Sequence, residues 1–100
     1  MEQILDLNKI KTDVTDIGGK YGVEKVYLFG SYARAQAVEN SDIDLRIEKG
    51  KIRGLFQLSG FKLALEEKTG KTVDLVTTDS LDNEFLEAIS TEEMLIYDSH

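Results

Sequence analysis

Cysteine is absent from this 100-residue sequence, and histidine occurs once, as the C-terminal residue His100. Without thiols the chain has no disulfide framework, no thiolate metal ligand and no cysteine nucleophile. A bound metal ion would therefore be held by oxygen or nitrogen, and the lone histidine makes oxygen the favoured ligand. Repeats, proline-rich linkers and low-complexity tracts are also missing from the sequence, which argues against a modular architecture.

Positive charge is scarce as well, because 12 lysine and arginine residues stand against 19 aspartates and glutamates, for a net charge of -7. Proteins bind nucleic-acid backbones by neutralising phosphates with basic side chains, so nucleic acid is not expected to be a direct partner. An acidic protein that handles a polyphosphate needs positive charge from elsewhere, and divalent cations held between carboxylates are the expected source.

The sequence contains no apolar run long enough to cross a bilayer, and its first residues, MEQILDLNKIK, lack the layout of a signal peptide. We therefore expect a cytoplasmic protein without a membrane partner. With 41% hydrophobic residues, the chain suits one modest core, and its length falls below the ~150 residues usual for a domain. A single domain over residues 1–100 is the expectation.

Apolar residues spaced three and four apart predict two long amphipathic helices. These are residues 3–17, ended by Gly18 and Gly19, and a segment from Leu55 to a cap at Gly70. Two shorter helices are predicted over residues 31–37 and around Phe85, Leu86 and Ile89, the second one capped by Asp79 or Ser80.

Short β-branched or alternating segments predict the strands. Residues 25–29 (KVYLF) are expected to be buried on both faces, whereas residues 42–47 (DIDLRI) alternate like a strand with one wet face. Further strands are expected at residues 72–77 and at MLIY, residues 94–97. Helices interleaved with strands indicate an α/β or α+β fold, with a small mixed β-sheet flanked by helices.

Aspartate is uncommon inside strands, yet the predicted strands carry Asp42, Asp44 and Asp74. Side chains two residues apart share a face, so Asp42 and Asp44 are presented together while Ile43 and Leu45 turn toward the core. Like charges this close repel each other, and a divalent cation would turn that repulsion into ligation. The three acids are candidate metal ligands. The alternative interpretation is that they line a solvated sheet face.

The pair Gly30-Ser31 ends the first strand and opens a short helix. Glycine lets a ligand approach the backbone, and the amides at a helix start, with the Ser31 hydroxyl, favour a phosphate. Beside a metal site this pair is a candidate phosphate grip, although alone it is more often a turn with an N-cap. Arg34 is a candidate phosphate or partner contact, or else an exposed helix arginine. Arg46 is expected to pair with Asp44.

The stretch LFGSYARAQAVENSDIDL, followed further along by VDLV, resembles the signature of polymerase beta-like nucleotidyltransferases. The flanking helices and the C-terminal LIY resemble the layout of the small members called minimal nucleotidyltransferases. The resemblance implies that Gly30 and Ser31 grip the phosphates of ATP. It also implies that Asp42, Asp44 and Asp74 hold two Mg²⁺ ions for in-line phosphoryl transfer, with Asp74 as the candidate base.

One position departs from the pattern of that family, because Ala35 stands where a glycine usually follows the Ala-Arg pair. If the backbone there is left-handed, alanine costs about 1–2 kcal/mol. That cost would loosen the loop without removing a metal ligand.

The resemblance also suggests a partner, since minimal nucleotidyltransferases commonly serve as antitoxins of HEPN-domain ribonuclease toxins. Some transfer AMP from ATP to a tyrosine of the toxin, which is the function expected here, in a hetero-oligomer with such a partner. The apolar N-terminal stripe or the segment around Phe85 is a candidate interface. Two alternatives stay open: an antitoxin that acts by contact alone, and a transferase that acts on a small hydroxylated molecule.

Overall fold

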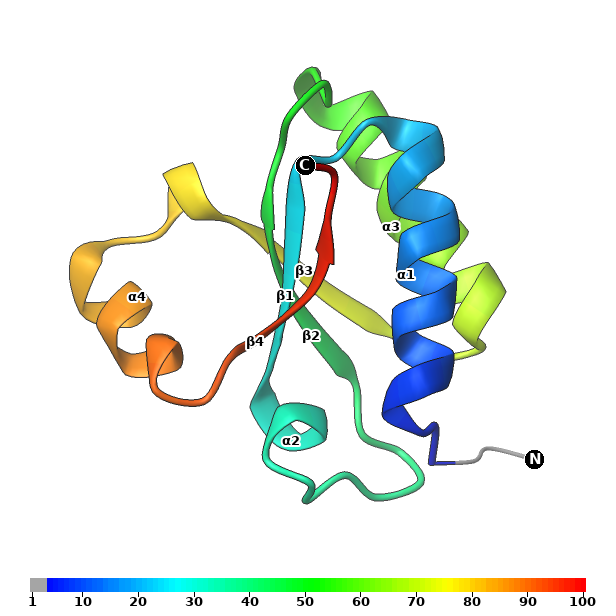
Figure 1. Cartoon of the computed structure of the whole chain (residues 1–100), viewed down its shortest axis with the longest axis vertical. Coiled ribbons are helices and arrows are strands. Elements are labelled where there is room, and N and C mark those ends of the chain that lie inside the picture. Colours follow the sequence, from blue (N-terminus) through cyan, green and yellow to red (C-terminus); the bar gives the residue numbers. More distant parts are fainter. Residues whose placement is uncertain (1–3) are drawn as a thin grey trace.

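A four-stranded sheet organises the computed structural model, which describes residues 4–100 (Figure 1). Its strands are β1 (Lys25–Phe29), β2 (Ile43–Glu48), β3 (Val73–Thr77) and β4 (Met94–Asp98), in the spatial order β3-β2-β1-β4. β1 pairs antiparallel with both β2 and β4, whereas β2 and β3 are parallel. This mixed sheet with its helices confirms the predicted fold class.

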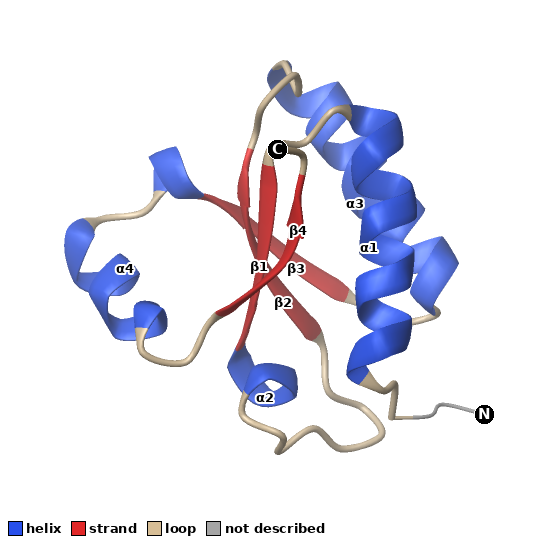
Figure 2. Cartoon of the chain, viewed as in Figure 1, coloured by secondary structure: helices blue, strands red, loops and turns tan. Residues whose placement is uncertain are grey.

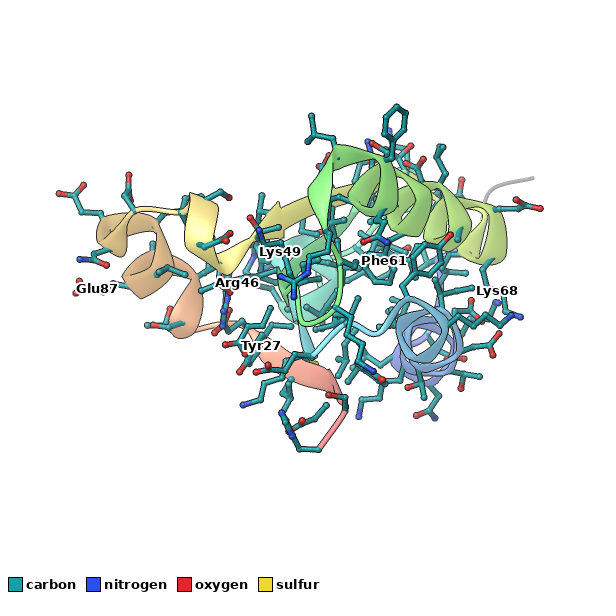
Figure 3. The ribbon with its side chains drawn as sticks, turned by 90° about the horizontal axis from the view of Figure 1, so that it is seen from above. Tyr27, Arg46, Lys49, Phe61, Lys68 and Glu87 are labelled. Atoms are coloured by element: carbon teal, nitrogen blue, oxygen red, sulfur yellow. The ribbon has the colours of Figure 1, made fainter. Side chains whose placement is uncertain are left out.

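Two long helices, α1 (Leu7–Tyr21) and α3 (Gly54–Thr69), lie side by side on one face of the sheet (Figure 2). Three short helical segments connect the strands: α2 (Gly30–Ala33), the 3-10 turn η1 (Thr78–Ser80) and α4 (Asn83–Ser90). α4 lies on the opposite side of the sheet from α1 and α3 (Figures 1 and 3). Among residues 4–100, no helix is both long and apolar enough to span a membrane.

The core lies between the sheet and the two long helices. Its fully buried side chains share the helix-facing side of the strands and the inner stripes of α1 and α3; the largest are Phe61, Ile10, Leu28, Ile43, Leu45, Ile47 and Leu65. β1 alternates between buried and partly exposed residues, so the prediction that it is buried on both faces is wrong. The long helices cover one face only, which leaves the other face of the sheet for polar side chains.

α1 differs from the predicted helix at both ends. Asp6 caps its start, because the Asp6 side chain accepts a hydrogen bond from the Lys9 amide at 2.8 Å. The helix passes through Gly18 and Gly19 and ends at Gly22, whose φ of +73° suits a C-terminal cap. Gly18 packs against Tyr97 of β4: a β-carbon there would lie 3.2 Å from that ring. Residue 3, the predicted start, lies outside the described residues.

The remaining helix ends follow local capping chemistry. Asp82, and not Asp79 or Ser80, caps α4 by accepting a hydrogen bond from the Phe85 amide at 2.8 Å. Residues 78–80 instead form the short 3-10 turn η1. Gly70 caps α3 in a left-handed conformation, as predicted. α2 is shorter than the predicted segment 31–37.

Candidate active site

The open face of the sheet, away from α1 and α3, brings Asp44 and Asp74 together. They are direct partners in the parallel β2–β3 ladder, and Phe29, the last residue of β1, lies opposite Asp44 on its other side. Asp44 is partly buried and Asp74 is exposed. Strands in a sheet lie about 4.8 Å apart, so the two carboxylates project from neighbouring backbones on the side that the long helices leave open.

Asp42 is the third predicted acid, and it is exposed just before the start of β2. Its negative charge raises the pKa of the Asp44 carboxyl group, so Asp42 lies near the Asp44–Asp74 pair although it is not part of the strand ladder. Among residues 4–100, the structure contains no group of three or more His, Asp or Glu side chains that is arranged to hold a metal ion. The structure therefore brings two of the three acids into register and leaves Asp42 beside them.

The crowding of carboxylates changes the acidity of Asp44. Burial of its side chain is the largest cause that raises its pKa to about 6, followed by hydrogen bonding to Asp74 and by the charges of Asp74 and Asp42. Arg34 acts in the opposite direction. A proton relieves the repulsion between these groups, and a divalent cation would do so as well, because hard cations such as Mg²⁺ take carboxylate oxygens as ligands. The donor set on this face fits such an ion.

Gly30 lies directly against Asp44, at the point where β1 passes into α2. Its φ is +76°, and a β-carbon built on it would lie 2.0 Å from Oδ2 of Asp44. Only glycine permits both this backbone conformation and this close approach. The Gly30-Ser31 turn therefore lies directly beside Asp44 of β2.

Glu92, in the segment between α4 and β4, also contacts this turn. The Gly30 amide donates to Oε1 of Glu92 at 3.2 Å, and Nη1 of Arg34 donates to Oε2 at 2.9 Å and to Oε1 at 3.1 Å. The Arg34 guanidinium is the main cause that holds the pKa of Glu92 below its usual range. Arg34 is thus engaged at the site, at the end of α2. No local pattern around Glu92 could have predicted its role, because the contact joins residues 62 apart.

Arg46 lies on the same face of β2 as Asp44 but pairs with Glu93, so the prediction of an Arg46–Asp44 pair is wrong. Two hydrogen bonds, of 2.9 Å from Nε and 2.7 Å from Nη2, join its guanidinium to the Glu93 carboxylate. The guanidinium also lies 4.0 Å from the centre of the Tyr27 ring (Figure 3), and it donates to Thr78 Oγ1 at 2.6 Å. Glu93 offers two oxygens in the geometry that a guanidinium fork prefers.

Ala35 has a left-handed backbone, with a φ of +58°, and it is the one non-glycine residue with positive φ among residues 4–100. The Gln36 amide closes the turn by donating to the Ser31 carbonyl at 2.8 Å. The conformation that would make alanine costly is therefore present, and the loop between α2 and β2 carries this strain.

A fold with this mixed sheet, and with acids and a glycine-serine turn on its open face, is that of a nucleotidyltransferase. The family model described as "Polymerase beta, Nucleotidyltransferase" matches residues 4–100. The chain therefore belongs to the polymerase beta nucleotidyltransferase family, a family of enzymes, and the resemblance seen in the sequence is confirmed.

Relatives with assigned names carry the comparison further. A Methanocaldococcus jannaschii protein named as a protein adenylyltransferase is 42% identical over 77 residues, which cover 77% of this chain and 83% of that protein. The protein adenylyltransferase MntA of Thermococcus cleftensis is 29% identical over 97 residues, which cover 93% of this chain and 98% of that protein.

Solved structures show the same arrangement of elements. One described as a minimal nucleotidyltransferase has a TM-score of 0.77 and 32% identity, and the match covers 90% of this chain and 95% of that one. A chain from a complex of a tri-AMPylated Shewanella oneidensis HEPN toxin with an MNT antitoxin has a TM-score of 0.69 and 17% identity, over 90% of this chain and 71% of that one. At that identity the second likeness shows a shared fold.

Proposed function

We propose that this chain is a nucleotidyltransferase antitoxin that transfers AMP from ATP to a tyrosine hydroxyl of a HEPN-domain toxin in the cytoplasm. The observation that carries the proposal is the placement of Asp44 and Asp74 side by side, next to Asp42 and to the Gly30 turn, on the open face of the sheet. The relatives named as protein adenylyltransferases support the type of reaction, and the HEPN toxin complex supports the type of partner.

In the proposed reaction, the tyrosine oxygen forms a bond to the α-phosphorus of ATP while the bond from that phosphorus to the bridging oxygen breaks. Pyrophosphate leaves with the electron pair of the broken bond, and Asp74, which is exposed beside Asp44, accepts the hydroxyl proton. Two Mg²⁺ ions held by Asp42, Asp44 and Asp74 would supply Lewis-acid stabilisation of the entering and leaving oxygens.

The turn at the end of β1 would hold the nucleotide in this proposal. The Gly30 amide and the Ser31 hydroxyl bind the phosphates, and Arg34 supplies the positive charge that the acidic face otherwise lacks. These groups position the α-phosphorus in front of the acids, because Gly30 and Asp44 are in direct contact. Positioning and charge stabilisation account for most of the catalysis of phosphoryl transfer.

The partner would dock on surfaces other than the apolar stripe of α1, since Ile10, Val14 and Ile17 of that stripe are buried in the core. Phe85 of α4 is 41% exposed, and on α3 Phe56 is 96% exposed. These apolar side chains are available for a protein contact, which supports a hetero-oligomer with the partner.

The test is the intact mass of the HEPN-domain protein after incubation with this chain, ATP and Mg²⁺. The proposal predicts the added mass of one or more AMP groups with the wild type and with Glu87→Gln, which makes a matched change of charge on α4, and no added mass with Asp44→Asn. If Asp44→Asn still neutralises the toxin in cells, contact alone is sufficient. If a small hydroxylated compound is modified in place of the partner, the assigned acceptor is wrong.

A further inference from the structure

Glu92 occupies the place where the proposed site would receive a phosphate. Its carboxylate accepts hydrogen bonds from the Gly30 amide at 3.2 Å and from Arg34 Nη1 at 2.9 and 3.1 Å. These donors belong to the groups assigned above to the nucleotide phosphates. A carboxylate held by a backbone N–H and a guanidinium has the same charge and the same acceptor pattern as a bound phosphate oxygen.

The two anions compete for the Gly30 amide. The Gly30 amide has one hydrogen, and its position against Asp44 leaves little freedom to turn toward a second acceptor. A negative carboxylate beside an incoming polyphosphate also adds repulsion on a face that already carries Asp42, Asp44 and Asp74. A nucleotide phosphate and the Glu92 carboxylate therefore exclude each other at this turn.

We propose that Glu92 is an internal competitor of the nucleotide: it binds the phosphate grip of Gly30 and Arg34 while the site is empty, and the nucleotide enters by displacing it. This inference rests on the proposed function, because it assumes that the turn binds nucleotide phosphates. It goes beyond that function by assigning to Glu92 control over nucleotide affinity.

The neighbouring residue shows how Glu92 can leave without unfolding the segment. Glu93 is fixed to Arg46 by two hydrogen bonds, and the side chains of this pair are only 12% and 10% exposed. The Glu93 and Glu92 amides both donate to the Ile89 carbonyl, at 2.8 and 3.0 Å. The Glu92–Arg34 pair is more open to solvent, at 26% and 44%. Its side chains can separate while the backbone stays anchored, since exposed ion pairs are weak.

The experiment is a calorimetric titration of the full chain with AMP-PNP and Mg²⁺, for the wild type, Glu92→Gln, Glu92→Asp and Glu87→Gln. Glu92→Gln should lower the Kd roughly three- to tenfold, because it removes the competing charge. Glu92→Asp keeps the charge but shortens the side chain, so it should also lower the Kd. Glu87 is exposed and lies in the middle of α4, away from the sheet (Figure 3), so Glu87→Gln should leave the Kd within about twofold of the wild type.

Unchanged or weaker binding by both Glu92 variants would overturn the inference, because Glu92 would then support Arg34 instead of competing with the nucleotide. Equal tightening by Glu87→Gln would overturn it too, by showing a general effect of net charge. If the Glu92 variants bind AMP-PNP more tightly but no AMP reaches the HEPN-domain protein, the inference stands and the proposed acceptor fails. If no form binds the nucleotide, both the proposed function and the inference fail.

Discussion

Gly30 and Asp44 fit together so closely that a β-carbon on residue 30 would lie 2.0 Å from Oδ2 of Asp44. Gly30 also has a φ of +76°, a conformation that other residues adopt only with strain. The turn proposed to hold phosphates and the strand proposed to hold metal ions are therefore joined by one contact. A change at residue 30 should disturb both at once.

Gly30→Ala should lower the free energy of unfolding by about 2 kcal/mol or more, from the left-handed backbone and the overlap with Asp44. It should also reduce AMP transfer strongly, because Asp44 has to move. The matched control is Gly19→Ala in α1, where the nearest atom to an added β-carbon is 4.0 Å away, and which should stabilise by up to about 1 kcal/mol. Urea denaturation checks both values, and equal stabilities of wild type and Gly30→Ala would refute the close fit.

Ala35→Gly should stabilise the protein by up to roughly 1.5 kcal/mol. Glycine removes the 1–2 kcal/mol cost of a left-handed alanine but adds about 0.5–1 kcal/mol of entropy to the unfolded chain. Ala37→Gly makes the same chemical change where φ is not positive, so it should destabilise. Thermal denaturation of the two variants compares them directly, and a loss of stability in both would show that the backbone at residue 35 is not left-handed.

The raised pKa of Asp44, to about 6, predicts how the stability of the metal-free protein depends on pH. The folded state binds this proton more tightly than the unfolded state, in which the Asp44 carboxyl has its ordinary pKa of 3.8. The contribution of Asp44 to stability is therefore fully present below about pH 4 and is lost as the pH rises through 6.

Asp44→Asn should remove that loss, so its stability relative to the wild type should rise between pH 4 and 6 and then level off. Chemical denaturation across this range gives the difference directly. At neutral pH, adding Mg²⁺ should make the wild type more stable than Asp44→Asn, because the ion binds the wild-type carboxylates. A constant difference between the two proteins from pH 4 to 7 would contradict the assigned crowding of carboxylates.

Glu93→Gln should cost about 2–4 kcal/mol of stability, because it leaves the largely buried Arg46 guanidinium without its ionic partner. The exposed pair of Lys49 with Asp79 provides the comparison: Asp79→Asn should change the unfolding midpoint little. Equal effects of the two substitutions would mean that burial of the Arg46–Glu93 pair does not change how much the pair contributes to stability.

The fold, and the strand positions of Asp44 and Asp74, were predictable from the sequence because their signals are local. Residues 42–47 alternate with a period of two, and β2 forms with Ile43, Leu45 and Ile47 buried. Gly70 stops α3 as expected, while the glycines at 18 and 19 do not stop α1, because close packing of Gly18 against Tyr97 outweighs the local propensity.

The partners of the arginines were not predictable, since they depend on where distant segments meet. Arg34 and Arg46 are held by the consecutive residues Glu92 and Glu93, which the return of the chain from α4 to β4 places beside the sheet. Before the fold is known, Asp44 and Glu48 are the nearest acids in sequence for Arg46, each two residues away. The exposure of Leu55, at 80%, also depends on how distant segments meet. Leu55 and Leu75 border an open hollow between α3 and β3.

The rate of pyrophosphate release from ATP, with and without the HEPN-domain protein, shows whether this chain transfers AMP to that partner. We expect Mg²⁺-dependent release that requires the partner and matches the AMP incorporated into it. The rate should fall at least about 100-fold in Asp44→Asn, while Glu87→Gln keeps the wild-type rate. Release at the wild-type rate by Asp44→Asn, or no release by the wild type when both ATP and the partner are bound, would contradict the proposed function.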